Sequence, residues 1–537
     1  MTDFPSFYKT ILGRKLFFLP IVFFSLLGYS FSIYNRTVGI DDFTRDINLG
    51  SGNRMLSGRW GMILWNKLVG TTVALDPFID RFLALVFLII AAILLCYILY
   101  IIGGKKRIIS YTIAASTFIT YPLINSIWEY TGADFMLTGN LCLVTLAAIT
   151  VKLQPFGGRY TLLAASLLLL LPMSSYESAI FYYITLGCII IFYEYYIRGI
   201  NNLYFIEWGK DIVSFFAPIV IAFIARFVVS FIVNVIFDLQ YSSGGSTAIA
   251  WLNDSPFQVM KCMLVFNFVK YVLTGLVYFP ITIFVAFILV FLGHLGRCNR
   301  KSIIFILSGA FILISLFSQS FLQGMELEYR NAQTISLFVS FSSFLLCTSV
   351  VNEKRRKLIY IILFALCWHQ AVCLNRILGL NNLRSDNEVA LIHQIGTRLT
   401  SEFEKKPVAF VGDHQKGDYI LKQISVDEFS WNGRLFYSIY DRFIAKLNRP
   451  YRFGANVNSV LGYYQLQECF SYFGYDVDVV LPSDLAKLDV YPKKYIKIGD
   501  VILTKASNIV KEKRIKPYQI IDAGDFLVVY LGGELYT

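Results

Sequence analysis

The chain has 537 residues, of which 56% are hydrophobic and 16% are charged, and its formal net charge is +12. A soluble globular protein of this length would carry more charge and fewer apolar side chains, so this composition and a mean hydropathy of +0.58 exclude that class. The positive charge does not indicate nucleic-acid binding, because the basic residues are spread over short loops between apolar segments. The sequence therefore predicts a polytopic α-helical membrane protein that contacts the lipid bilayer and binds no nucleic acid.

Apolar segments close to the ~20 residues needed to cross a bilayer recur about eleven times along the chain. The segment 257–270, which Lys261 and Lys270 interrupt, instead predicts an amphipathic helix at the membrane surface. The predicted spans are 16–34, 81–102, 108–127, 135–151, 160–176, 179–197, 211–236, 271–294, 302–322, 334–351 and 358–377.

Basic residues gather in alternate short loops. Of the loops on the opposite side, the first, at 35–80, is an exception and carries several bases. The other short loops on that side together carry only one, Arg330. By the positive-inside rule the N-terminus is cytoplasmic, and an odd number of spans then places the C-terminal region outside. The bases of the cytoplasmic side are Lys9, Arg14, Lys15, Lys105, Lys106, Arg107, Lys152, Arg159, Arg198, Lys210, Arg297, Arg300, Lys301, Lys354, Arg355, Arg356 and Lys357.

The first outer loop, residues 35–80, departs from this pattern because it combines bases and acids. One interpretation is that the bases pair with neighbouring acids and lipid headgroups. The other is a site for an anionic substrate held in the membrane, since the planar fork of arginine suits phosphate. The bases are Arg36, Arg45, Arg54, Arg59 and Lys67, and the acids are Asp41, Asp42, Asp46, Asp76 and Asp80.

Two motifs of this loop, "GIDDFTRD" at 39–46 and "LSGRW" at 56–60, carry a family resemblance. With a cytoplasmic N-terminus, many spans and a soluble outer domain, they resemble the serotype-converting O-antigen glucosyltransferases, which are polytopic enzymes of GT-C architecture. The resemblance implies a multi-pass protein of the bacterial inner membrane. It implies transfer of a sugar, glucose, from a polyprenyl-phosphate donor such as undecaprenyl phosphate. The implied acceptor is a surface polysaccharide such as the O-antigen of lipopolysaccharide, on the extracytoplasmic face.

Such a transfer needs a general base, because the acceptor hydroxyl loses a proton as it attacks the anomeric carbon. Asp42 or Asp41 is the candidate, with Asp42 slightly favoured, while the other holds Arg45 or a sugar hydroxyl. The ordinary aspartate pKa of about 3.9 is low for a base, and burial beside a second carboxylate would raise it. The leaving lipid phosphate gathers negative charge, and Arg45 and Arg59 are the first candidates to stabilise it.

Arg226 is a third candidate for the donor phosphate. It lies about 14 residues into the span 211–236 counted from the cytoplasmic side, hence ~21 Å along a helix and ~9 Å below the outer surface of the hydrocarbon core. Snorkelling of its side chain to the headgroups is the alternative. An ionisable residue inside a span is nevertheless a functional-site hypothesis, and a lipid phosphate is its natural partner.

Further outer-face residues are candidates for substrate binding. A structural salt bridge is the simpler interpretation of Arg330, and an aromatic belt at the interface is favoured for Trp60, as for Trp65, Trp128 and Trp251. The candidates are Glu129 and Asp134 in "SIWEYTGADF", Tyr176 and Glu177 in "MSSYES", Arg330 in "QGMELEYRN", and Trp60.

No cofactor or metal is predicted. The four histidines are scattered without metal-ligand spacing, and the chain contains no P-loop and no dinucleotide fingerprint. The absence of a nucleotide motif agrees with a sugar already activated on a lipid.

Residues 378–537 differ in character from the membrane domain 1–377, and they predict a soluble extracytoplasmic α/β domain. Ile392, Ile395, Leu399 and Phe403 form a helical stripe before the strand-like run "VAFVG". The runs "DVILTKASNIV" and "YQIIDAGDFLVVYLG" are also predicted as strands. This domain is expected to shape the acceptor site or to bind polysaccharide.

Two other functions are alternatives to sugar transfer. A transporter or flippase of lipid-linked saccharides would place charges near mid-membrane and show broken helices in two related halves. A non-catalytic polysaccharide-binding or assembly protein would need no general base.

Overall fold

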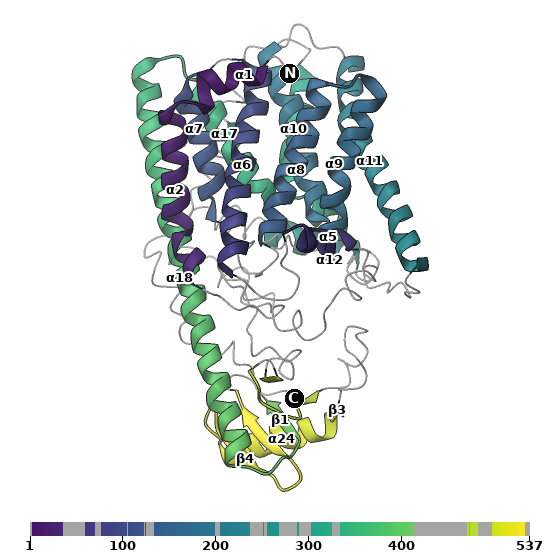
Figure 1. The fold of residues 1–537 in the computed structure, drawn as a ribbon, viewed down its shortest axis with the longest axis vertical. Helices are drawn as coiled ribbons and strands as arrows, with labels where there is room; N and C mark the ends of the chain where they lie inside the picture. The colour runs from purple at the N-terminus through teal and green to yellow at the C-terminus, as the bar shows by residue number, and fades with distance from the viewer. Residues whose placement is uncertain are drawn as a thin grey trace. The chain divides into compact units, whose positions relative to one another are not determined.

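In the computed structural model the chain is mostly helical, and it divides into two compact units (Figure 1). The first unit contains the described residues up to Leu378 except Asn35, and the second contains Asn35 and the described residues from Gly379 onward. The structure describes residues 3–35, 59–69, 77–104, 106–122, 124, 134–198, 205–236, 251, 255–267, 287–288, 291, 302–324, 333–411, 470–471, 473–481 and 497–531.

The first unit is a bundle of apolar helices. Among the described residues six helices are long and apolar enough to cross a membrane, namely α2 (Lys15–Tyr34), α6 (Pro77–Gly103), α8 (Asp134–Leu153), α10 (Ser178–Arg198), α11 (Phe205–Ile236) and α18 (Glu353–Ser401). Four further apolar helices are α7 (Ile108–Thr120), α9 (Gly158–Ser175), α15 (Ser302–Leu316) and α17 (Gln333–Ser349). The shorter elements are α1 (Asp3–Phe7), the π-helix η1 (Tyr8–Leu12), α5 (Trp60–Val69), α12 (Pro256–Asn267) and α16 (Ser318–Gln323).

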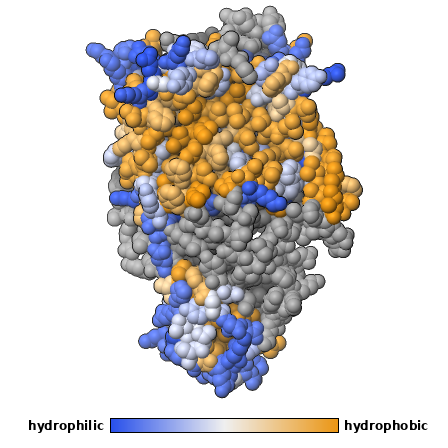
Figure 2. Space-filling model, in the orientation of Figure 1, coloured by the Kyte–Doolittle hydropathy of each residue, from blue (hydrophilic) through white to orange (hydrophobic). Residues whose placement is uncertain are grey.

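These helices agree with the predicted polytopic membrane protein. Ten of the predicted spans coincide with helices, and α12 forms where a surface helix was predicted. The predicted span 271–294 lies almost wholly outside the described residues, so the count of eleven stays a prediction. Figure 2 shows the apolar side chains as a broad hydrophobic band over the bundle. Helix α11 contributes strongly to that surface, since only 11% of its most apolar stretch is buried inside the protein.

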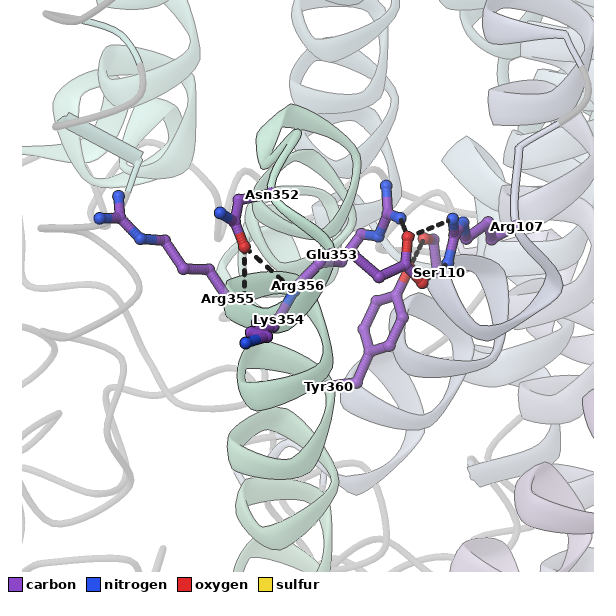
Figure 3. Close-up of polar contacts among 8 residues, drawn as sticks. All are labelled: Arg107, Ser110, Asn352, Glu353, Lys354, Arg355, Arg356 and Tyr360. Atoms are coloured by element: carbon purple, nitrogen blue, oxygen red, sulfur yellow. Dashed lines mark hydrogen bonds and ion pairs between the residues drawn. The ribbon is translucent and has the colours of Figure 1, made fainter.

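At one end of the bundle, two of the basic segments that the charge pattern predicted to share a side contact each other. Arg107, before α7, binds Glu353 at the start of α18 through two parallel hydrogen bonds of 2.8 and 2.9 Å, and Arg356 binds the same carboxylate (Figure 3). Asn352 caps α18 by accepting hydrogen bonds from two backbone N–H groups. Near this end of the bundle Lys152, at the end of α8, forms an ion pair with Glu194 of α10. The structure thus joins the basic segments around Arg107 and Glu353, and the topology of the chain in the membrane stays a prediction.

The second unit combines helices and short strands among its described residues. Its strands are β1 (Val408–Val411), β2 (Val480–Leu481), β3 (Lys497–Ile498), β4 (Ile520–Asp522) and β5 (Leu527–Tyr530), and its helix is α24 (Asp500–Lys513). Strand β5 lies between β1, to which it is parallel, and β4, to which it is antiparallel, while β2 and β3 form a separate parallel pair. The last turns of α18 pack on one face of β1 and α24 on the other.

The structure confirms part of the prediction made for residues 378–537 and corrects another part. The stripe of Ile392, Ile395 and Leu399 is buried, and the runs around β1, β4 and β5 are strands. The prediction of a strand over "DVILTKASNIV" is wrong, because these residues form α24. Its buried Ala506 and Val510 are four residues apart, which is helical spacing, and Asp500 and Lys511 complement the helix dipole at its two ends. For this segment, the helical spacing of the buried residues determines the secondary structure more than its content of β-branched residues does.

Candidate functional site

Two guanidinium groups from distant parts of the chain converge on one carboxylate. Arg226 of α11 donates to Glu177 Oε1 at 2.7 Å, and Arg59, just before α5, lies 3.4 Å from Glu177 Oε2. Glu177 itself sits in the two-residue connection between α9 and α10. The structure thus brings together three residues that the sequence proposed separately. We refer to Arg59, Tyr176, Glu177 and Arg226 as the arginine–glutamate cluster.

The sequence left open whether the Arg226 side chain extends to the lipid headgroups or is held within the protein, and the structure shows that it is held. Its side chain is only 13% exposed and it is fixed by Glu177, so the guanidinium is held in the protein instead of extending freely to headgroups. Arg59 and Glu177 are more accessible, at 40% and 39%. The cluster is therefore buried on the α11 side and open on the side of Arg59.

Tyr176 and Trp60 complete the surroundings of Arg59. The Arg59 guanidinium lies over the Tyr176 ring at 5.4 Å, a cation–π distance that restricts the arginine without using its N–H groups. Arg59 Nε and Trp60 Nε1 are buried and have no hydrogen-bond partner among the described residues.

The electrostatics of the cluster favour an ionised glutamate. Burial alone would raise the pKa of Glu177, but the charges of Arg59 and Arg226 and the hydrogen bond from Arg226 outweigh it, so the pKa stays below its ordinary value. Glu177 is therefore anionic at neutral pH and does not resemble a general base poised to accept a proton. With one negative and two positive groups, the three side chains have a net charge of +1, which suits an anion.

Close packing of α5 on α9 positions Arg59. In Figure 1 α5 lies at the end of the bundle opposite α1. A Cβ atom at Gly61 would meet Ser175 Oγ at 2.6 Å and the backbone oxygen of Leu171 at 2.8 Å, so only glycine allows this approach. In the middle of α5, Trp65 is buried and donates from Nε1 to Asn140 Oδ1 of α8 at 3.0 Å. Trp65 thus packs inside the bundle, and its assignment to an interfacial belt is wrong.

We expect Gly61→Ala to lower both thermal stability and the sugar transfer that the family resemblance implies. The added methyl group must push α5 away from the α9 backbone, an overpacking that typically costs about 1–3 kcal/mol, and Arg59 moves with the helix. Gly209→Ala is the matched control, because a Cβ at this helical glycine meets nothing within 4 Å. Thermal unfolding of the purified variants and their transfer rates measure the effect. Equal behaviour of the two variants would contradict the proposed packing constraint.

Asp134 occupies a different environment from the cluster. It is fully buried at the start of α8 and forms an ion pair with Arg81 of α6, with Arg81 Nε 3.7 Å from Asp134 Oδ2. Arg81 also donates to the backbone oxygen of Ser32, at the end of α2, at 2.7 Å. The pair ties three helix ends together, and a sugar-binding role for Asp134 stays a prediction. Arg81 was not among the predicted candidates, because it begins a long apolar run and its partner Asp134 lies far along the chain on another helix.

The remaining candidates lie outside the described residues. They are the proposed bases Asp41 and Asp42, the proposed phosphate ligand Arg45, and the proposed substrate ligands Glu129 and Arg330. Among the residues that the structure does describe, no group of three or more His, Cys, Asp or Glu side chains could hold a metal ion.

The fold and the cluster define a polytopic membrane protein in which two arginines converge on one glutamate at one end of the helical bundle. Residues 30–347 match the glucosyl transferase GtrII family. The match covers more than half of the chain and includes all four cluster residues, so the protein belongs to this family, the serotype-converting O-antigen glucosyltransferases. No curated protein and no solved structure matches the chain. The family resemblance of the two first-loop motifs is thereby confirmed, and the protein is a membrane glucosyltransferase.

Proposed function

We propose that the protein transfers glucose from a polyprenyl-phosphate donor to a surface polysaccharide, the O-antigen, on the extracytoplasmic face of the bacterial inner membrane. The observation that carries this proposal is the convergence of Arg59 and Arg226 on Glu177 within a glucosyltransferase family. Two cations that a shared carboxylate holds in place suit a phosphate that remains attached to a membrane lipid.

In the proposed reaction an acceptor hydroxyl attacks the anomeric carbon of glucose. A new glycosidic C–O bond forms while the bond from that carbon to the phosphate oxygen breaks. The hydroxyl proton passes to Asp42, or to Asp41, and the polyprenyl phosphate leaves as a monoester with an additional negative charge. Arg59 and Arg226 stabilise this charge, and Glu177 holds the arginines in position before the donor arrives. This division of roles needs no metal ion for the leaving phosphate.

The topology proposed for this reaction has a cytoplasmic N-terminus and an extracytoplasmic C-terminal domain. Support comes from the two chemically different ends of the bundle. The end with Arg107, Glu353 and Arg356 carries the basic short loops, while the arginine–glutamate cluster lies at the other end. By the positive-inside rule the cluster then faces away from the cytoplasm, where a donor headgroup and a surface polysaccharide meet.

The test is reconstitution of the full chain in liposomes that contain polyprenyl-phosphate glucose, with O-antigen supplied on one side only. We expect glucosylated O-antigen and free polyprenyl phosphate to form in equal amounts. Proteolysis of the C-terminal unit from outside the vesicles reports the orientation of the protein. Movement of intact donor across the bilayer without cleavage would support the transporter alternative. Transfer only when acceptor is on the side of the basic loops would overturn the proposed face.

A further inference from the structure

A second feature of the first unit is an apolar pocket between α10, α11 and α15, with a volume of about 280 Å³. Its walls include Ile184 and Cys188 of α10, Ile212 and Phe216 of α11, and Phe311 of α15. The volume is slightly below the ~300–1,000 Å³ of typical small-molecule sites, so it fits a segment of a chain and not a whole lipid.

The polar atoms in the pocket wall are already engaged. Trp208 Nε1 donates to Ser308 Oγ at 3.0 Å. Ser315 Oγ donates to the backbone oxygen of Ile312 at 2.7 Å, and Ser318 Oγ to that of Ser315 at 2.8 Å. The wall therefore offers a ligand few hydrogen bonds. A hydrocarbon ligand, which needs none, suits this pocket better than a polar one.

The pocket opens toward the lipid-facing surface of the bundle. Phe311 and Ile314, at its α15 edge, are 42% and 52% exposed, although they are large apolar side chains. In a membrane protein such a surface meets acyl or isoprenoid chains, so a hydrocarbon chain can enter from the side without crossing water.

Helix geometry aligns this pocket with the arginine–glutamate cluster on two helices. Ile184 and Cys188 follow Glu177 by 7 and 11 residues, which is close to whole numbers of turns at ~3.6 residues per turn. Ile212 precedes Arg226 by 14 residues, again close to whole turns. On α11 the pocket side is thus close to the side that carries Arg226, and on α10 the pocket lies two to three turns beyond Glu177, which sits just before this helix begins. The separation is ~10 Å from Glu177 to Ile184 and ~21 Å from Arg226 to Ile212 along the helix axes.

We propose that this pocket binds part of the isoprenoid chain of the donor, whose phosphate lies at Arg59 and Arg226. The inference rests on the proposed function and adds a chain-binding subsite, by which the protein recognises the carrier through its hydrocarbon as well as through its phosphate. A donor with a chain too short to span ~10 Å cannot use this subsite.

The test uses a polyprenyl phosphate that carries a photoreactive group on its chain, added to the full-length protein in liposomes. We expect labelled peptides from α10, α11 or α15. Ile212→Trp fills the pocket, and we expect it to reduce the labelling and to weaken long-chain donor binding about tenfold. Val213→Trp is the matched control, since Val213 is the adjacent residue, lies outside the pocket wall and is 67% exposed. Cys188→Phe fills the same pocket from α10 and replaces Ile212→Trp if that variant does not fold.

Three results would overturn the proposal. One is labelling confined to helices other than α10, α11 and α15, and another is labelling that neither pocket-filling variant reduces. The third is equal labelling by a photoreactive phospholipid that polyprenyl phosphate does not displace, which assigns the pocket to an ordinary membrane lipid. Labelling requires no turnover, so it separates this inference from the proposed function. Labelling without glucose transfer refutes only the enzyme activity, and transfer without labelling refutes only the subsite.

Discussion

Asp42→Asn should reduce glucose transfer by about 10²–10⁴-fold, while the variant inserts and unfolds like the unaltered protein. Asparagine keeps the shape of the side chain but cannot accept the proton of the acceptor hydroxyl. The affinity for the donor should change little, because the phosphate is held by arginines. The measurement is the transfer rate at saturating donor and acceptor, together with thermal unfolding of the purified protein.

Asp41→Asn distinguishes the two neighbouring carboxylates. If Asp42 is the base, Asp41→Asn changes the rate less, and its effect falls on Arg45 or on a sugar hydroxyl. The opposite ranking would exchange the two roles. A double variant that still transfers glucose at the unaltered rate would remove this pair from the mechanism altogether.

Arg226→Ala should weaken use of the donor by about 10²–10³-fold and affect use of the acceptor much less. The substitution removes a fixed cation from the leaving phosphate and also leaves Glu177 with Arg59 alone, at the longer distance of 3.4 Å. Donor and acceptor are titrated separately, and the change in kcat/KM is compared for each. Equal effects on both substrates would favour a general structural role for Arg226.

A double-mutant cycle with Glu177→Gln tests whether the two residues act as one unit. Because Arg226 and Glu177 lie 2.7 Å apart, their effects on donor use should be far from additive. Arg107→Ala is the matched control, since Arg107 also binds a glutamate but at the other end of the bundle. It should leave the KM for the donor unchanged. Additive effects at Arg226 and Glu177 would contradict the proposed coupling.

Hydropathy alone located most of the helical bundle. The predicted span 135–151 corresponds to α8 at Asp134–Leu153, and 211–236 corresponds to the membrane part of α11. The reason is physical, since a backbone in hydrocarbon must satisfy its own hydrogen bonds and a long apolar run in a membrane therefore becomes a helix. Where water is present this constraint disappears. Accordingly, the prediction of a strand was wrong for α24, and the continuation of α18 to Ser401 was not anticipated.

The site was predictable as a set of residue types but not as an arrangement. The sequence indicated that Arg59, Glu177 and Arg226 lie near the same face of the membrane. It gave no means of seeing that one carboxylate joins both arginines, because this depends on how α9, α10 and α11 pack and on where α5 lies. The buried pair of Arg81 and Asp134 was hidden for the same reason. Helix packing decides which side chains come into contact. The periodicity of a single segment says little about how the helices pack.

The pair of Arg81 and Asp134 also constrains how the protein is made. A translating ribosome delivers α6 well before α8, so the Arg81 guanidinium emerges while its carboxylate partner is still unsynthesised. Releasing α6 alone would leave this guanidinium without its carboxylate near the end of the helix, at a cost below the about 2.5–3.5 kcal/mol that translocon-insertion scales give for a charge at a helix centre. The backbone oxygen of Ser32, on the already synthesised α2, offers this guanidinium a provisional acceptor. Helices α2, α6 and α8 are therefore expected to leave the insertion machinery together, as one preassembled group.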